Sequence, residues 1–304
     1  MAATADLTAT LPRADRSFGF RLALPAILIL VVLLAIPAIL TVIYSMHNVP
    51  PSGVSFGAFV GFDNYTLIFS SPVFWRSVST TAIFAAGFVV FSTLIGLMMA
   101  LLLNQPFIGR GIARAMLIIP WATPWLVIGI LWKWFADGSV GGLNAVLTQL
   151  HVIGEYHEFL SDPKLALPLT ILATVWRQAS FAGILLLAGL QTLPEELSEA
   201  AQLDGASVWD RFVHITLPWL RPMLITVIVL NVIYAFLQFD VVFAMTQGGP
   251  GDATQVLSIL IYRQLFAATH VGVGSALAVV LGVVSLLGGL LVVKLLYRPV
   301  VPAT

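Results

Sequence analysis

Residues that could do chemistry are sparse in this chain. It has no cysteine, which excludes disulfides, thiolate metal sites and a cysteine nucleophile. No Ser/His/Asp arrangement or pair of carboxylates stands out, and the glycine-rich run 248–251 lacks the GxxxxGKS/T form of a phosphate-binding loop. The histidines lack the spacing of metal ligands: His47, His151, His157, His214 and His270. We therefore expect no cofactor or metal in this chain and no enzymatic activity of its own.

The composition points to a membrane protein. The chain has 304 residues, of which 59% are hydrophobic and only 9% are charged, whereas about 25% are charged in ordinary soluble domains. A chain this apolar could not cover a folded surface with polar groups in water, so soluble, disordered and collagen-like classes are excluded. Fourteen basic residues balance fourteen acidic ones, which leaves no basic excess for nucleic acid. The class that remains is an integral membrane protein, which would be in contact with lipid.

Six stretches are long and apolar enough to cross the membrane as helices, which need about 20 such residues. Continuous apolar runs such as 27–34 favour helices over the alternating pattern of barrel strands. Residues 22–298 are predicted to form one transmembrane domain, with tails at 1–21 and 299–304 and a loop at 191–217. This all-α integral membrane fold has predicted spans at about Leu22–Met46, Ser77–Leu103, Ile112–Phe135, Leu165–Leu190, Pro218–Ala244 and Val271–Tyr297.

Basic residues predict the orientation of the spans, because Lys and Arg concentrate in cytoplasmic segments. One set of connecting segments holds nine of the fourteen: Arg13, Arg16, Arg21, Arg110, Arg114, Arg211, Arg221, Lys294 and Arg298. The opposite set holds the other five: Arg76, Lys133, Lys164, Arg177 and Arg263. Because the number of predicted spans is even, both termini are expected in the cytoplasm.

The segment Leu193–Pro222, between the fourth and fifth spans, is the most charged part of the chain. Pro194 marks a helix start, and it is followed by acids that the helix dipole favours in the first turns. Gly205 then allows a sharp bend, and a second short helix is expected to end at Leu217-Pro218. An amphipathic helix on the membrane surface is the alternative, but residues 195–211 carry five acids and one arginine, which anionic lipid would repel. A rigid hairpin that binds a protein partner is the better interpretation.

The same segment resembles the EAA loop in the membrane subunits of bacterial ABC importers. The matching residues, at the spacing of that motif, are Glu199-Ala200-Ala201, Gly205, Ile215 and Leu217-Pro218. The resemblance implies the type I importer permease fold, in which this loop forms a coupling helix that docks on an ATPase subunit. It implies a coupling role for Glu199, Ala200, Ala201, Asp204, Gly205, Ala206 and Arg211. ATP and Mg would then be bound by the partner ATPase subunits.

Further segments resemble carbohydrate-importer permeases, in particular the larger maltose-importer subunit and its alpha-glucoside and glycerol-phosphate relatives. They are Phe59–Tyr65; Trp132–Phe135 with Gly141, Gly142 and Asn144; and Phe239-Asp240 with Met245–Pro250 and Ala253-Thr254. The resemblance covers nearly the whole chain from about residue 20, but the extra N-terminal helices and outer domain of the maltose subunit have no counterpart in it. It implies a bacterial inner-membrane location. The implied partners are a second homologous permease, two ATPase subunits and an extracytoplasmic solute-binding protein.

Polar residues inside the fifth span indicate where a solute could touch. Asn231, Tyr234 and Gln238 are spaced by three and four residues, which predicts one helical stripe. Amides and an aromatic ring suit a sugar, while hydrogen bonding between helices is the alternative. The outer run Gly248-Gly249-Pro250 is expected to form a tight turn at the membrane edge, and it is a candidate for contact with the binding protein or for an outer gate.

Two charged residues bear on the choice of function. Asp240 lies about 200° round the helix from Gln238 and is expected to pair with a base or to cap the outer turn. Arg177, inside the fourth span, could bind an anionic solute, although an ion pair or snorkelling is the alternative. The rival function, a self-sufficient secondary transporter or channel, would need coupling groups at mid-membrane, and Asp240 is the only acid within a predicted span. A membrane-embedded enzyme is the weakest alternative.

Overall fold

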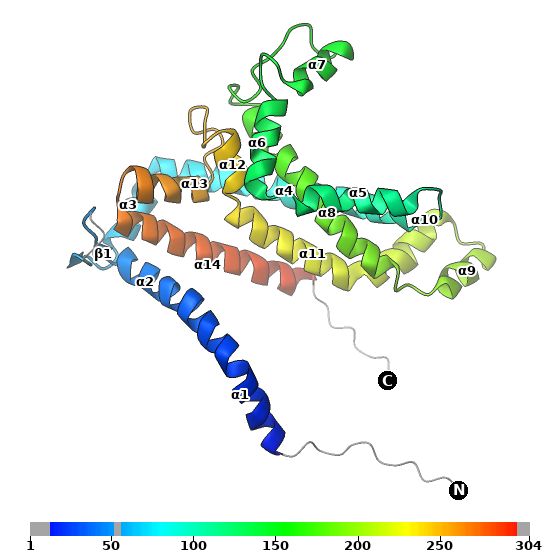
Figure 1. Cartoon of the computed structure of the whole chain (residues 1–304), viewed down its shortest axis with the longest axis horizontal. Helices are drawn as coiled ribbons and strands as arrows, with labels where there is room; N and C mark the ends of the chain where they lie inside the picture. The colour runs from blue at the N-terminus through cyan, green and yellow to red at the C-terminus, as the bar shows by residue number, and fades with distance from the viewer. Residues whose placement is uncertain (1–12, 52–55, 297–304) are drawn as a thin grey trace.

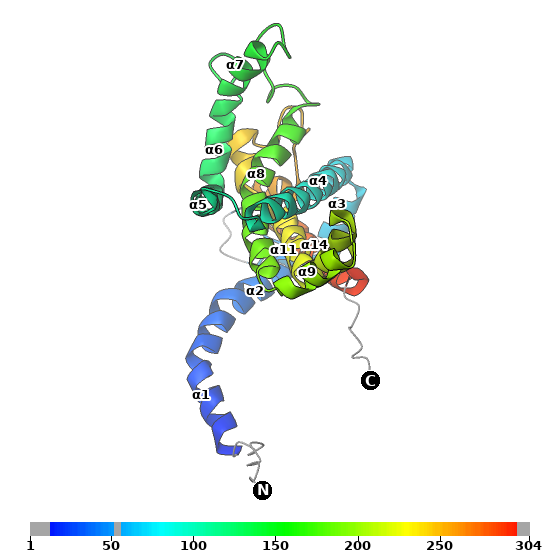
Figure 2. The same cartoon turned by 90° about the vertical axis from the view of Figure 1, so that its right-hand side faces the viewer.

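The computed structural model of the chain describes residues 13–51 and 56–296, and Figures 1 and 2 show it as a bundle of helices. Its long elements are α1 (Arg13–Leu30), a π-helical turn (Val31–Ala35) and α2 (Ile36–Ser45), α4 (Pro72–Asn104), α5 (Arg110–Ala122), α6 (Trp125–Phe135), α8 (Ala166–Leu190), α11 (Leu217–Leu237) and α14 (Val271–Leu296). Its short elements are β1 (His47–Asn48), β2 (Ala58–Phe59), α3 (Asp63–Ser70), α7 (Gly142–Gln149), α9 (Glu195–Leu203), α10 (Val208–Arg211), a π turn (Phe212–Thr216), α12 (Asp240–Met245), α13 (Leu257–Tyr262) and a π turn (Arg263–Ala267). By length and apolarity, the described residues contain five membrane-spanning helices, or six if the bent pair α5 and α6 counts as one span.

The centre of the bundle is the contact of α4 with α8 and α11. A Cβ atom added at Gly96 of α4 would lie only 2.6 Å from the Cβ of Ala182 in α8. Small residues of this kind let membrane helices approach closely and gain dispersion contacts. Phe84 and Phe88, also on α4, are fully buried in a separate cluster with Val175 and Ala179 of α8.

The N-terminal helix leaves this bundle. α2 packs against α14, whereas α1 extends away from the other helices in both views (Figures 1 and 2). None of the most apolar window of the helix Phe18–Ser45 is buried, so this apolar surface must face lipid or another subunit. Residues 13–21, which we expected to be a tail, are helical, because each residue added to an existing helix gains a backbone hydrogen bond. The rest of the expected tails, 1–12 and 299–304, lies outside the described residues.

The third predicted span, Ile112–Phe135, is wrong as a single straight helix. α5 and α6 meet at an angle of 98°. The cause is Pro124, which has no N–H to donate and disfavours helical angles in the residue before it. Thr123 accordingly has φ −75° and ψ 130°. Apolarity continues through this break, so the hydrophobic pattern alone did not reveal it.

The fifth predicted span, Pro218–Ala244, differs from the structure at both ends. The helix runs without interruption from Val208 to Leu237, so Leu217-Pro218 does not end the second helix of the loop. The π turn Phe212–Thr216 carries the helix past Pro218, whose missing N–H disturbs the ordinary bonding pattern. At the other end Gln238 is extended (ψ 117°), and a separate helix, α12, follows.

Candidate coupling surface and solute path

The hairpin formed by α9 and α10 turns at Gly205. Gly205 has φ +82°, a left-handed conformation that glycine adopts without strain. The N–H groups of Gly205 and Ala206 donate to the carbonyls of Gln202 and Ala201 at 3.1 and 2.9 Å, which is the paired bonding of a Schellman motif. A Cβ at Gly205 would meet nothing within 4 Å. The bend is therefore set by the backbone of the hairpin itself.

Two side-chain contacts hold the hairpin together. Ser207 and Asp210 form a capping box at the start of α10, which satisfies two otherwise free N–H groups. Arg211 Nη1 donates to Ser198 Oγ at 3.3 Å and to Gln202 Oε1 at 3.4 Å, and so ties α10 to α9. Arg211, which the motif placed on the coupling surface, thus also stabilises the shape of that surface.

The hairpin presents acidic and apolar side chains together. Glu199, Ala200 and Asp204 are exposed, while Ala201 and Ala206 are half-buried. Large apolar side chains are exposed on the same hairpin: Leu197, Leu203, Val208 and Trp209, with Leu203 at 90% and Trp209 at 69%. Exposed apolar patches with a polar rim mark interaction sites. We did not single out Trp209 from the sequence, although a large aromatic residue in the most charged loop was the available signal.

The hairpin lies at one end of the bundle. In Figure 1, α9 and α10 are at the right, and β1 and α3 are at the left. Asn64 of α3 holds the left-hand end together, because its Nδ2 donates to the carbonyls of Ser45 and His47 at 2.9 and 3.1 Å. Tyr65 adds a 2.7 Å bond between its hydroxyl and Ser45 Oγ. The segment Phe59–Tyr65 therefore closes the outer end of the first span.

Asn231 does not face an open path. Its Oδ1 accepts from Gln178 Nε2 at 2.7 Å and its Nδ2 donates to Thr93 Oγ1 at 3.1 Å. These bonds join α11 to α8 and α4, and Asn231 is fully buried. Asn231 therefore takes part in hydrogen bonding between helices, which was the alternative interpretation of the polar stripe.

Tyr234 and Gln238 are placed differently. Tyr234 remains on α11 with 40% of its surface exposed. Gln238 lies beyond the last helical residue, so the expected single stripe is wrong for it. Its side chain is 5% exposed and its Nε2 is buried without a hydrogen-bond partner among the described residues. Its carbonyl accepts from Ser258 Oγ at 2.6 Å. Asp240, expected to cap a turn or pair with a base, is exposed in the first turn of α12.

The two helix breaks lie side by side. α6 and α12 pack so closely that a Cβ on Gly129 would be 2.6 Å from the Cβ of Ala244. Trp125 follows the first break, at Thr123. It contacts the two buried clusters that contain Val241 and Val242, which come just after the second break, at Gln238. Unwound backbone within a membrane is tolerated where it is buried in protein or lines a cavity.

Arg177 of α8 stabilises the first break. Its Nε donates to the Thr123 carbonyl at 2.9 Å, and its guanidinium lies 3.9 Å from the centre of the Trp125 ring. The break leaves that carbonyl without an ordinary helical donor, and the aromatic face attracts the cation. Arg177 thus links α8 to the break between α5 and α6.

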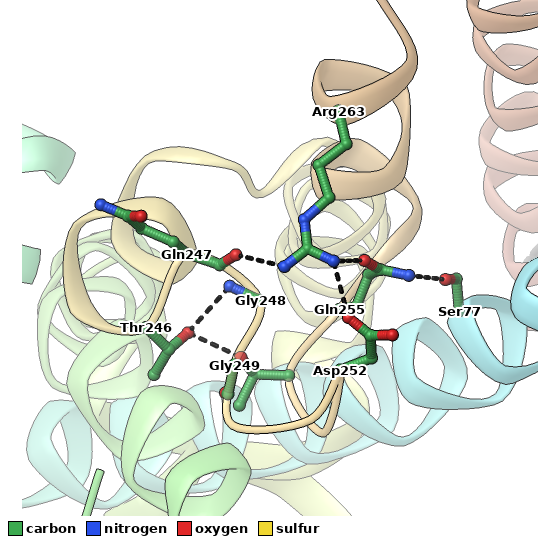
Figure 3. Close-up of polar contacts among 9 residues, drawn as sticks. Ser77, Thr246, Gln247, Gly248, Gly249, Asp252, Gln255 and Arg263 are labelled. Carbon is green, nitrogen blue, oxygen red and sulfur yellow. Dashed lines mark hydrogen bonds and ion pairs between the residues drawn. The ribbon is translucent and has the colours of Figure 1, made fainter. Parts of the chain in front are cut away.

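The loop 246–255, which we expected on the outer side, is held by Arg263 (Figure 3). Arg263 Nη1 pairs with Asp252 Oδ1 at 2.6 Å and also bonds Gln255 Oε1, while Nη2 donates to the Gln247 carbonyl at 3.0 Å. Gln255 Nε2 in turn donates to Ser77 Oγ of α4 at 3.2 Å. A planar guanidinium with several donors suits this role. The loop is therefore fastened both to the π turn that follows α13 and to α4.

The predicted turn Gly248-Gly249-Pro250 is present within this loop. Thr254 Oγ1 donates to the Gly249 carbonyl at 2.7 Å and lies 2.6 Å from Thr246 Oγ1. Gly248 is buried, with φ +90°, and a Cβ there would come within 2.9 Å of Ile259. Gly249 and Pro250 are half-buried, while Gln247 and Gly251 are exposed. The motif glycines mainly shape the loop, and its surface is formed by their neighbours.

The second outer segment, 136–165, is stabilised locally. Asn144 donates to the carbonyls of Asp137 and His157 at 3.0 Å each and accepts from the His157 N–H at 2.9 Å. The N–H groups of Val140 and Ser139 hold the pKa of Asp137 below its ordinary value. Within the described residues, no group of three or more His, Cys, Asp or Glu side chains could hold a metal ion.

Known transport proteins resemble this chain over most of its length. Residues 92–304 match the sequence profile of the family described as binding-protein-dependent transport system inner membrane component. The trehalose/maltose transport system permease protein MalF of Thermococcus litoralis is 36% identical over 90% of this chain and 92% of its own length. The sulfoquinovosyl glycerol transport system permease protein SmoG of Agrobacterium fabrum is 35% identical over 90% of this chain and 88% of its own length. The sn-glycerol-3-phosphate transport system permease protein UgpA of Pectobacterium atrosepticum is 33% identical over 86% of this chain and 87% of its own length.

Two solved structures share the backbone arrangement. One is a bacterial ABC transporter involved in the import of the acidic polysaccharide alginate, with a TM-score of 0.80, 22% identity, and coverage of 93% of this chain and 96% of that chain. The other is a bacterial alginate ABC transporter in complex with an alginate pentasaccharide-bound periplasmic protein, with a TM-score of 0.79, 22% identity, and coverage of 93% and 94%. The predicted all-α, type I importer permease fold is confirmed.

Proposed function

The chain belongs to the family of inner membrane components of binding-protein-dependent transport systems, and from this premise we propose that it forms half of the translocation path of an ATP-driven sugar importer. The observation that carries the proposal is the cytoplasmic hairpin, which is rigid at Gly205 and exposes Leu203 and Trp209. Such a surface fits a groove on a separate ATPase subunit. Two such subunits would bind ATP and Mg and perform the hydrolysis.

A sugar or a related polyhydroxy compound is the proposed solute. The relatives MalF, SmoG and UgpA are named for transport of trehalose or maltose, sulfoquinovosyl glycerol and glycerol-3-phosphate. Transporters commonly place substrate groups at discontinuous helices, and Gln238 lies at such a break. The exposed ring of Tyr234 offers a stacking face, and the unpartnered amide of Gln238 offers donors. Asn231 supports this site by fixing α11 rather than by touching the solute.

Continuity of the helix from Val208 to Leu237 suggests how the hairpin acts on the path. A displacement of α10 by the ATPase subunits would be carried along one helix to Tyr234 and the Gln238 break. Closure on ATP would thus change the spans from inward-open to outward-open. For hydrolysis to drive this change, the ATPase subunits and the binding protein must bind the two states with different affinities.

Two surfaces suit the remaining partners. The unburied apolar helix Phe18–Ser45 would pack against a second permease subunit as well as lipid. The fastened loop 246–255, with Gln247 and Gly251 exposed, would meet a solute-binding protein at the outer face. Both termini would then lie in the cytoplasm of a bacterial cell.

Reconstitution tests this function. The chain, its neighbouring permease and the ATPase subunits should be assembled in liposomes and supplied with the binding protein and its radiolabelled sugar. We expect uptake only when ATP is accessible to the ATPase subunits and the binding protein is on the opposite side. Uptake by this chain alone without ATP would instead establish the rival secondary transporter or channel.

A further inference from the structure

A chamber at the cytoplasmic end of the bundle contains two arginines that the proposed transport cycle does not use. It lies between the end of α4, the start of α5, the end of α8 and the hairpin, with a volume of about 440 Å³. Its polar lining includes Asn104, Gln105, Arg110, Arg114, Gln191 and Ser198. Glu195, on α9, is the one carboxylate among the residues that line it.

Arg114 is a fixed charge. Its Nη2 donates to the Leu103 carbonyl at 3.0 Å. With the Gln191 amide turned so that its oxygen faces the guanidinium, that oxygen accepts from Nη1 and Nη2 at 3.1 and 3.0 Å. The Nε atom is buried with no partner among the described residues. These partners are neutral, so they position the positive charge without compensating it.

Arg110 lies one turn earlier on the same helix and is half-buried. Among the side chains that the structure describes, 18–51 and 56–296, the ion pairs are His157–Asp162 and Arg263–Asp252. Arg110 and Arg114 therefore have no carboxylate in ion-pair contact within the described chain. A partly buried charge without a counter-charge is costly, so an anion from outside the chain would complement these arginines.

The surroundings place this charge at the membrane surface. α5 begins at Arg110 after Gly109 (φ +88°), and no side chain caps its N-terminus, so free N–H groups add to the positive potential. Apolar side chains stand exposed beside the arginines: Phe107, Ile108 and Ile112. Basic groups at headgroup depth beside apolar groups match the profile of a phospholipid.

We propose that the chamber binds the phosphate of an anionic phospholipid in the cytoplasmic leaflet. Two neighbouring guanidinium groups, of which that of Arg114 is held in place by hydrogen bonds, can make strong charge-assisted bonds to phosphate oxygens, and basic pockets between cytoplasmic helix ends are suited to anionic headgroups. The acyl chains would lie along Ile108 and Ile112. Because Ser198 of α9 borders the chamber and its hydroxyl can donate to a phosphate oxygen, the bound headgroup would also support the base of the hairpin.

The test uses the assembled importer in detergent, titrated with phosphatidylglycerol or phosphatidylcholine, with bound lipid counted by native mass spectrometry. Arg110→Gln is the decisive variant, because no described side-chain hydrogen bond depends on Arg110. We expect phosphatidylglycerol affinity to fall about fivefold for each arginine removed, in Arg110→Gln and again in Arg110→Gln/Arg114→Gln. Binding of phosphatidylcholine should stay weak in every variant.

Arg221→Gln is the matched control, since Arg221 lies on the same side and bonds only the Leu296 carbonyl. It should leave phosphatidylglycerol affinity unchanged. Equal affinity of wild type and Arg110→Gln would overturn the proposal. Full displacement of the lipid by inorganic phosphate would also overturn it, because it would indicate a site for soluble phosphate. Lipid binding that occurs only after the ATPase subunits are removed would overturn it too, because it would indicate that a protein contact occupies the chamber.

Discussion

Gly205 is the residue on which the shape of the cytoplasmic hairpin depends most directly. A non-glycine residue at φ +82° is strained by about 1 kcal/mol or more, and a β-branched one by more. This is small beside the stability of the packed spans, so Gly205→Val should still insert in the membrane. We expect it to reduce ATPase co-purification or solute-stimulated hydrolysis several-fold by redirecting the exposed Trp209 surface. Gly205→Asn is the control, because asparagine tolerates the left-handed conformation.

A charge reversal tests the same surface. Glu199→Lys should weaken ATPase binding, whereas Glu155→Lys on the outer segment should not. Wild-type co-purification and hydrolysis in both Gly205→Val and Glu199→Lys would refute the coupling role of the hairpin.

Asn231 and Tyr234 lie one helical turn apart, but replacing them should affect different properties of the complex. Asn231→Ala removes the acceptor of Gln178 and the donor to Thr93, which should lower the stability of the purified complex by about 1 kcal/mol. Tyr234→Ala, and likewise Gln238→Ala, should leave assembly intact but reduce transport and change the order of solute preference. The measurements are thermal unfolding and competition for uptake. Normal transport with unchanged preference in Tyr234→Ala would mean that this surface is not part of the solute path.

At the scale of elements, the bend between α5 and α6 depends on a contact from a third helix. Arg177→Met removes the donor to the Thr123 carbonyl and the cation over Trp125. We expect a loss of roughly 1–3 kcal/mol, the usual cost of leaving a buried polar group unpaired, and slower transport of all solutes alike. Arg76→Met, at the exposed outer end of α4, is the control. A selective change of solute preference in Arg177→Met would show that Arg177 contacts the solute and does not only position the break.

At the scale of the whole molecule, the distribution of basic residues predicts the orientation in the membrane. The hairpin and residues 155–162 should lie on opposite sides, with both termini on the side of the hairpin. Reporter fusions after the C-terminus and within residues 155–162 should therefore give opposite signals in intact cells. Matching signals would show that α8, α11 and α14 do not all cross the membrane, so that the predicted number of spans is wrong.

Features that depend on neighbours within a few residues were readable from the sequence. The hairpin is one: the predicted helix start at Pro194 and the predicted bend at Gly205 are both present. The membrane class and the approximate places of the long helices are others, because they follow from apolarity summed over about 20 residues. The family motifs were recognisable for the same reason, since each is a short run with fixed spacing.

Only the tertiary structure decided where apolar runs break and which polar groups face a path. Apolarity continues through Thr123 and through Gln238, and the break at Thr123 is stabilised by Arg177, 54 residues away. Asn231 and Tyr234 look equivalent in the sequence, yet α4 and α8 supply hydrogen-bond partners for Asn231 only. Such outcomes depend on which helices pack together, because a polar group in a membrane takes whatever partner the neighbouring helix offers. That partner is not encoded in the spacing of residues along one helix.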